Sequence, residues 1–109
     1  MTTRSTVLLA DQMTLAKATI SRTVPPNQVW LLKRVSLAVI SPNSGSVLVY
    51  VHRPSMQLYV AFLEFDTSVR SRYDYDTWVV LQAADELLVS PSGVEGGVWC
   101  SGAVLPAAS

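Results

Sequence analysis

The feature that most constrains this chain is how short its apolar runs are and how regularly turn residues interrupt them. In the C-terminal third, residues 78–81, 86–89 and 98–101 are strand-length runs rich in Val, Leu and Trp, with a turn at residues 82–85. Runs of this length and composition predict antiparallel β-strands rather than helices. Breakers containing Pro, Gly, Ser or Asn recur at residues 25–27, 41–46, 53–55, 90–93 and 96–97. Few intervals between these breakers could hold a helix.

Alternating side chains predict further strands over residues 29–40, 46–53 and 56–65, and a weaker one over residues 67–73. In the first of these, one nearly all-apolar face is formed by Val29, Leu31, Val35, Leu37 and Val39. The other face is mixed, as expected of a strand whose outer side also contacts something. In residues 56–65, parity predicts two opposite faces: Leu58, Val60, Phe62 and Glu64 on one, and Tyr59, Ala61, Leu63 and Phe65 on the other.

The start of the chain is ambiguous between helix and strand. Apolar residues between positions 8 and 20 fit helical spacing, but Thr14, Thr19 and Thr23 favour extended chain, and we expect strands there. A long connection is expected around Pro25 and Pro26. The whole pattern predicts an all-β fold, namely a single antiparallel two-sheet β-sandwich, jelly-roll-like, with about eight short strands.

Composition indicates one domain with more apolar surface than it can bury alone. The chain has 109 residues, of which 50% are hydrophobic and only 15% charged, against a usual charged share of about 25%. We expect one domain over residues 1–106 and a short tail over residues 107–109. The apolar surplus predicts that the domain buries part of its surface against other subunits.

Charge and cysteine content exclude several classes of partner and site. Eight basic and eight acidic residues give a formal net charge of zero, so we expect no nucleic-acid binding. The single Cys100 excludes an internal disulfide, and Cys100 with the single His52 cannot make a zinc site within one chain. The run at residues 7–10 is too short for a signal peptide, and Lys33 and Arg34 interrupt the longest apolar stretch, so we expect no membrane partner.

Three segments together carry a resemblance to a known group of proteins. Residues 24–35 read Val-Pro-Pro-Asn-Gln-Val-Trp-Leu-Leu-Lys-Arg-Val, residues 78–87 place Ala-Ala-Asp-Glu-Leu after Trp-Val-Val-Leu-Gln, and residues 98–106 run from Val-Trp-Cys-Ser to Leu-Pro. Over roughly residues 20–106, this order resembles small β-sandwich, jelly-roll-like structural proteins of tailed bacteriophage virions. In that pattern the turn often carries Gly where Ala84 stands, so the turn type is in question.

The resemblance implies a structural role in the virion. Members of the group are typically minor tail, neck or head-decoration proteins, and many form trimers. The implied partners are copies of the chain itself, as a trimer or higher ring, and other virion proteins. The implied location is the tail or capsid surface, after synthesis in the host cytoplasm. The group has no shared active site or cofactor that could be transferred to this chain.

The search for catalytic chemistry among the residues is mostly negative. His52 is the single imidazole, and it follows Val51 just before the Arg53-Pro54 turn, where we expect a surface or interface histidine. Cys100 lies between Trp99 and Ser101, without basic neighbours in sequence, and is expected to be a small buried residue. We expect no enzyme activity and no cofactor.

The densest cluster of polar and aromatic residues is Tyr73, Asp74, Tyr75, Asp76 and Trp78. In an extended segment, the two tyrosines would point one way, and the two aspartates and the tryptophan the other. Aromatic rings and carboxylates suit glycan recognition, and paired aspartates could contribute to a calcium site, although one Asp-x-Asp supplies few oxygens. The structural alternative, which we favour, is a loop-to-strand junction whose rings contact a neighbouring subunit.

Two arginines, Arg70 and Arg72, share one parity of the weaker strand. They could protect a sheet edge from unwanted strand pairing, or they could dock an acidic partner surface. Taken together, we expect a non-enzymatic virion protein, most simply a tail or tail-tip component that forms a ring. Capsid decoration or a neck position is the alternative within the same class, and a glycan-binding module for host recognition is the alternative from another class.

Overall fold

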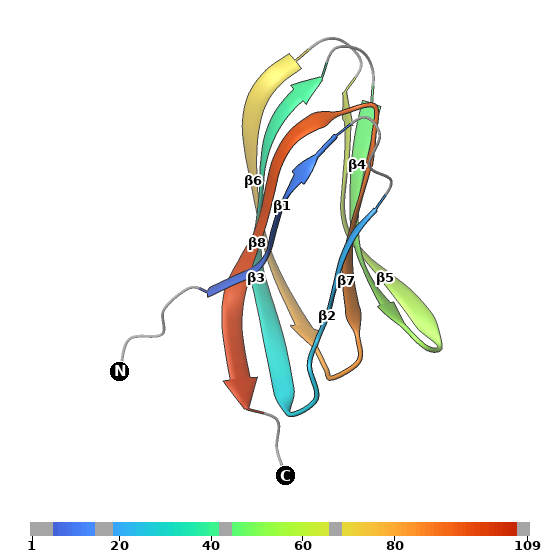
Figure 1. The fold of residues 1–109 in the computed structure, drawn as a ribbon, viewed down its shortest axis with the longest axis vertical. Coiled ribbons are helices and arrows are strands. Elements are labelled where there is room, and N and C mark those ends of the chain that lie inside the picture. Colours follow the sequence, from blue (N-terminus) through green and yellow to red (C-terminus); the bar gives the residue numbers. More distant parts are fainter. Residues whose placement is uncertain (1–5, 15–18, 42–44, 66–68, 107–109) are drawn as a thin grey trace.

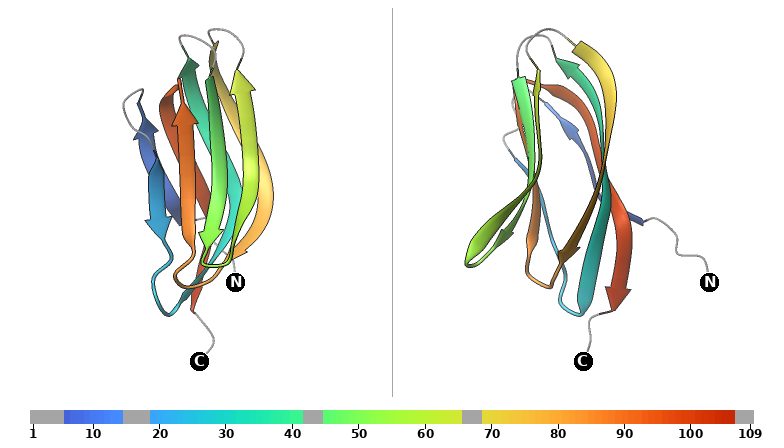
Figure 2. Two further views of the ribbon diagram at one scale, coloured as in Figure 1. Left: turned by 90° about the vertical axis from the view of Figure 1, so that its right-hand side faces the viewer. Right: turned by 180° about the vertical axis from the view of Figure 1, so that it is seen from behind.

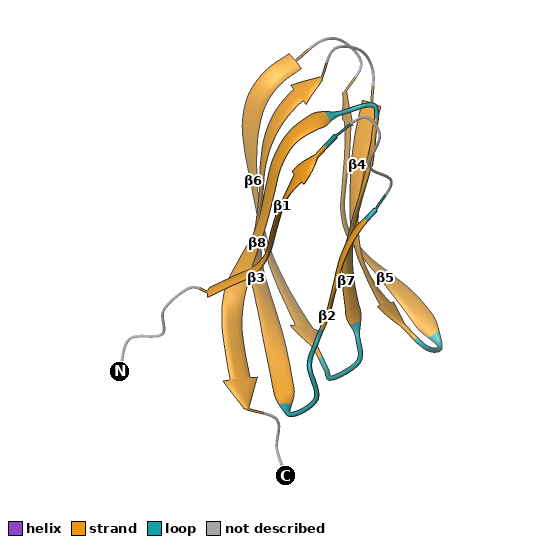
Figure 3. Ribbon diagram, in the orientation of Figure 1, coloured by secondary structure: helices purple, strands orange, loops and turns teal. Residues whose placement is uncertain are grey.

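The computed structural model describes residues 6–14, 19–41, 45–65 and 69–106, which form eight strands and no helix (Figure 1; Figure 3). The strands are β1 (Thr6–Met13), β2 (Ile20–Thr23), β3 (Gln28–Ser41), β4 (Gly45–Arg53), β5 (Met56–Phe65), β6 (Val69–Leu81), β7 (Glu86–Ser92) and β8 (Glu95–Pro106). Within the described ranges no helix could span a membrane.

The strands form two antiparallel sheets of four strands, in the orders β1-β8-β3-β6 and β2-β7-β4-β5 (Figure 2). Successive strands change sheet at every connection except the β4–β5 hairpin. This interleaving, in which β8 lies between β1 and β3 while β7 lies between β2 and β4, is the jelly-roll arrangement of a two-layer sandwich. The predicted fold class is therefore confirmed, and the ambiguous start of the chain contributes the strands β1 and β2.

The core is one apolar layer between the sheets. Many of its most deeply buried side chains come from the central strands: Leu32, Val35, Leu37, Val39, Val98 and Cys100 from one sheet, and Val47, Val49, Val51, Leu87 and Val89 from the other. Full burial of a side chain of this size contributes about 1.5–3 kcal/mol. β-branched and Leu side chains fill both inner faces. A shift of one residue in the pairing of a central strand would turn these side chains to the outside, so their burial fixes the register.

Two β-bulges overturn the parity expected for β3 and β5. In β3, Leu32 pairs with Gly102 and Arg34 with Ser101, so Lys33 is an extra residue relative to β8. The bulge reverses the alternation, since Leu32 and Val35 both face the core. The predicted grouping of Val29 and Leu31 with Val35, Leu37 and Val39 was therefore wrong: Val29 and Leu31 lie on the outer side.

The bulge in β5 has the same effect on its aromatic residues. Val49 pairs with Ala61 and Tyr50 with Tyr59, so Val60 is the extra residue. Tyr59 and Phe62, predicted on opposite faces, both point outward and are 69% and 56% exposed. Parity from sequence assumes an uninterrupted pleat, and one extra residue changes the face of every residue after it.

Two connections also differ from the expectation. The predicted weaker strand over residues 67–73 and the strand over residues 78–81 are parts of one long strand, β6, so the aromatic and acidic cluster lies within a strand rather than at a junction. The connection at Pro25 and Pro26 is only four residues long, from Val24 to Asn27, between β2 and β3. It is short because Asn27 takes the left-handed conformation, with φ 72°, and the Gln28 N–H donates to the Pro25 carbonyl at 3.3 Å.

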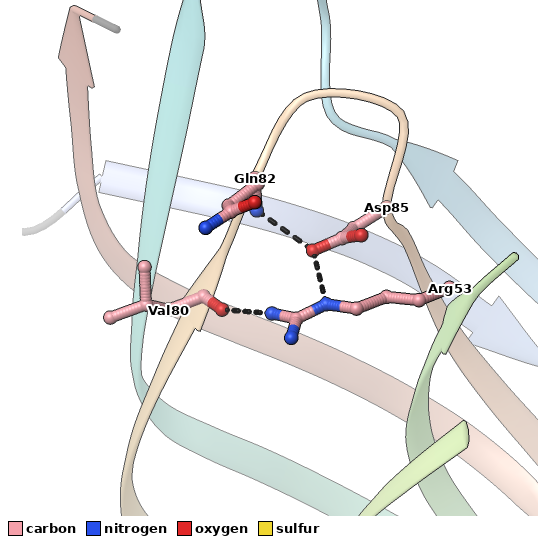
Figure 4. Close-up of polar contacts among 4 residues, drawn as sticks. All are labelled: Arg53, Val80, Gln82 and Asp85. Atoms are coloured by element: carbon pink, nitrogen blue, oxygen red, sulfur yellow. Dashed lines mark hydrogen bonds and ion pairs between the residues drawn. The ribbon is translucent and has the colours of Figure 1, made fainter. Parts of the chain in front are cut away.

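An ion pair ties the end of β4 to the turn between β6 and β7 (Figure 4). Arg53 Nε donates to Asp85 Oδ2 at 2.9 Å, and Arg53 Nη2 donates to the Val80 carbonyl at 2.8 Å. The same Asp85 oxygen accepts the Gln82 N–H at 2.8 Å. Because β4 and β6 belong to different sheets, these bonds join the two layers at one end of the sandwich.

We expect Asp85→Ala to lower the free energy of unfolding by about 3 kcal/mol, because it leaves a partly buried guanidinium and a turn N–H without their acceptor. Chemical denaturation followed by tryptophan fluorescence measures the change. Asp76→Ala is a matched control, since it removes an Arg–Asp pair of similar length, 2.8 Å, that lies in solvent. The control should cost less than about 1 kcal/mol. Equal losses for both variants would contradict the role given to Asp85.

The turn between β6 and β7 contains a strained alanine. Ala84 has φ 72°, a left-handed conformation that glycine adopts without penalty. Its N–H donates to the Val24 carbonyl at 3.0 Å, which anchors the turn to the β2–β3 connection. We expect Ala84→Gly to raise the free energy of unfolding by about 0.5–1 kcal/mol. Ala83→Gly, one residue earlier and outside the left-handed region, should instead lower it slightly, and a gain there of the same size would remove the strain argument.

Candidate interaction surfaces

The outer side of the sheet β1-β8-β3-β6, called here the β3 face, carries a row of paired charges. Arg34 and Asp76 are opposite each other on β3 and β6, and Arg34 Nε donates to Asp76 Oδ1 at 2.8 Å. This hydrogen bond and the charge of Asp76 raise the pKa of Arg34. Next along β6, Arg72 Nε is 3.9 Å from Asp74 Oδ1. Both aspartates of the predicted cluster are thus paired with arginines.

These ion pairs occupy the carboxylate oxygens that a calcium ion would need as ligands. Both carboxylates face guanidinium groups on the same surface, and a calcium site needs several further oxygen ligands. In the part of the chain that the structure describes, no three His, Cys, Asp or Glu side chains are grouped as metal ligands would be.

The structure divides the predicted cluster between the two sides of β6, as the alternation predicts. Tyr73 and Tyr75 pair with the core residues Leu37 and Val35, which places both rings on the inner side. Trp78 lies on the β3 face, where Lys33 Nζ is 5.8 Å from the centre of its ring. The three rings therefore do not form one platform for a sugar.

Trp78 instead belongs to an exposed apolar patch on the β3 face. Leu31 pairs with Val80, and Val29, two residues before it, pairs with Leu105, so the register brings all four onto the side that carries Trp78. Trp78 is 70% exposed, and Val80 and Leu105 are 45% and 46% exposed. This group of five residues is called the Trp78 patch below. An exposed apolar group of this kind indicates a contact surface.

A hollow of about 440 Å³ lies further along the same face. Trp99 and Val7 form its apolar walls, and Arg34, Arg72 and Ser36 add polar groups. The Trp99 ring lies close over Gly97, where a Cβ would be 3.0 Å from the ring, so the absence of a side chain at Gly97 leaves room for the ring on the sheet. The predicted docking residue Arg72 thus borders the hollow, whereas the side chain of Arg70 lies outside the described residues.

The opposite side of the molecule, the outer side of β2-β7-β4-β5, is called the β4 face and carries a second patch. Tyr50 and Tyr59 pair across β4 and β5 with ring centres 6.2 Å apart. Leu48 pairs with Phe62, and Leu88 of β7 pairs with Tyr50. These five residues are called the aromatic patch below. Sequence reasoning missed it because the bulge at Val60, which no local sequence signal marks, is what brings Tyr59 and Phe62 together.

The single imidazole and the single thiol lie apart. His52 is exposed on the β4 face, where its Nδ1 is 3.5 Å from Gln57 Nε2. Cys100 points into the core from β8, and burial raises the pKa of its thiol to about 12. The structure does not bring these two groups together, and a thiol with so high a pKa is a poor nucleophile at neutral pH.

Comparison with known proteins identifies the fold and no family. No protein-family model matches the chain, and no curated protein sequence does. Twelve chains of solved structures match its fold. One of them is the core of the Drosophila protein NLP, described in connection with pentamer formation and histone binding. The match has a TM-score of 0.56 and 16% sequence identity, and covers 92% of this chain and 99% of the Drosophila chain.

Burial of Cys100 gives the stability a specific dependence on alkaline pH. The thiol pKa is about 12 in the folded chain, against 9.0 for the free group. The unfolded chain loses this proton first as the pH rises, so the stability is intact below pH 9 and falls above it. We expect the free energy of unfolding to drop by about 1.4 kcal/mol more between pH 8 and pH 10 than in Cys100→Ala. Parallel losses in the two proteins would contradict this.

Proposed function

We propose that this chain is a non-enzymatic structural protein of a tailed-phage virion that associates with copies of itself. The observation that carries the proposal is the presence of exposed apolar patches on both broad faces of a sandwich whose interior is already filled. Large exposed side chains on a domain this small favour a subunit contact over a free surface. Trp78 and Tyr59, each about 70% exposed, are of the types most frequent at interface anchors.

The sequence resemblance supports the virion setting. Its three segments fall on the β2–β3 connection with the first half of β3, on the end of β6 with the β6–β7 turn, and on β8. A minor tail or tail-tip component, as a trimer or higher ring, is the position we propose. A neck or capsid-decoration position within the same class uses the same mechanism: a rigid sandwich presents fixed faces to its neighbours.

The fold neighbour supports self-association in a limited way. The Drosophila core with the same fold is described in connection with pentamer formation, so a sandwich of this kind can serve as the subunit of a pentamer. Histone binding is not extended to this chain, because its equal numbers of acidic and basic residues provide no overall field for a basic partner.

A second candidate function, glycan recognition, is favoured by the hollow beside Trp99. An aromatic ring flanked by Arg34 and Arg72 could pack on a sugar ring and bind its substituents. This site differs from the one expected from sequence, which required Tyr73, Tyr75 and Trp78 on a common surface.

Size-exclusion chromatography with light scattering tests the main proposal. We expect the purified chain to elute as an oligomer of at least three copies at micromolar concentration, with a mass that is a multiple of 11.9 kDa. A folded monomer at high concentration would contradict self-association. If such a monomer bound host cell-wall polysaccharide saturably, and Trp99→Ala abolished the binding, the glycan alternative would be favoured instead.

For the virion setting, the measurement is mass spectrometry of purified particles of the phage that encodes the chain. We expect its peptides in intact particles at a level set by a fixed copy number. Their absence from particles that contain the other structural proteins would contradict that part of the proposal.

A further inference from the structure

The two apolar patches lie on opposite sides of one protomer. The Trp78 patch is on the outer side of the sheet β1-β8-β3-β6, and the aromatic patch is on the outer side of β2-β7-β4-β5. The two sheets are stacked as layers (Figure 2), so these outer sides face away from each other. One neighbour in a single position cannot cover both patches.

We propose that the β3 face of one copy packs against the β4 face of the next, so that copies join head to tail in a repeating assembly. This inference rests on the self-association proposed above and specifies its geometry. A contact between two different surfaces repeats from copy to copy. Because the two faces point away from each other, it gives an open stack of copies unless the faces are inclined enough for the rotation between copies to divide a full turn. A contact between identical surfaces would stop at a pair and leave the other patch exposed.

The shapes of the two faces favour this pairing. The β3 face has the hollow of about 440 Å³ beside Trp99, whereas on the β4 face Tyr59 and Phe62 project, with 69% and 56% of their surface exposed. Projecting rings fit against a hollow face, while two hollow faces would leave a void between them. Voids at a contact forfeit the close packing from which interface cores gain their stability.

The charges favour the same pairing. On the β3 face, Lys33 lies beside Trp78, and no carboxylate pairs with it among the described side chains. On the β4 face, the register places Glu64 and Glu86 near the two ends of the aromatic patch, and the described residues include no ion pair to either. Two β4 faces packed together would bring these carboxylates close to one another, and the described basic group of this face, His52, lies opposite Glu86 at one end of the patch. Packing of a β3 face against a β4 face would instead bring Lys33 toward the carboxylates at the ends of the aromatic patch.

The test uses one variant for each face of the full chain. Trp78→Ser removes the centre of the Trp78 patch, and the double variant Tyr59→Ser with Phe62→Ser removes the projecting rings. We expect each variant alone to elute as a monomer at concentrations where the original chain is an oligomer. Mixed in equal amounts, they should form a pair of twice the 11.9 kDa chain mass and nothing larger, because each retains one intact face.

The control is Met56→Ser at the β4–β5 hairpin. Met56 is 49% exposed and pairs with Arg53 at the tip, away from both patches. It should keep the original oligomer. Circular dichroism checks that every variant is folded. Lys33→Glu provides a second variant of the β3 face that removes no core contact, and it should also shift the oligomer toward monomer.

The outcomes separate this inference from the function on which it rests. A monomeric original chain would overturn self-association itself. An oligomeric original chain in which one face variant remains a dimer while the other is monomeric would show a contact between identical faces and overturn the head-to-tail arrangement. Two folded, monomeric variants that fail to pair on mixing would overturn it as well.

Discussion

The apolar layer between the sheets is the constraint on which the rest of the structure depends, and β-bulges, among them those in β3 and β5, decide which residues enter it. Because Lys33 is an extra residue in β3 relative to β8, the side chains of Leu32 and Val35 both face the core. With Val60 as the extra residue in β5, Tyr59 and Phe62 are turned to the outside. These two local irregularities therefore affect both which residues fill the interior and which aromatic residues lie on the surface.

The sequence predicts the fold class because its signals are repeated along the chain. Regular breakers and Val-rich runs point to strands throughout, and the two-sheet arrangement follows from the need to bury two apolar faces. Strand ends and connections are less predictable, since β6 continues through the polar residues between Tyr73 and Trp78. The reason is tertiary: β6 pairs with β3 on both sides of a register shift at Thr77 and Trp78, and the pairing holds Asp74 and Asp76 extended although aspartate is uncommon in strands.

The candidate surfaces are less accessible to sequence reasoning than the fold. Trp78 was singled out from sequence and is indeed exposed, but its companions Leu31, Val80 and Leu105 come from three strands and meet only through register. The aromatic patch was missed altogether because simple alternation separates Tyr59 from Phe62. The alternation of side chains can be read from one strand, whereas a surface patch depends on how several strands pair. A single bulge is therefore enough to make the face expected from alternation wrong.

Mutations in the core and mutations on the exposed patches should have different effects in this chain. The Arg53–Asp85 pair and the buried Val and Leu side chains act within one protomer, so their loss weakens folding at any concentration. Trp78, Tyr59 and Phe62 contribute little to the core of a single copy, because most of their surface remains in water. If copies assemble through these rings, their contribution to stability appears only as the assembly forms, and it grows with concentration by mass action. Under the proposed function, a small sandwich without disulfides would gain stability from its neighbours in this way, which would account for the low share of charged residues in the sequence.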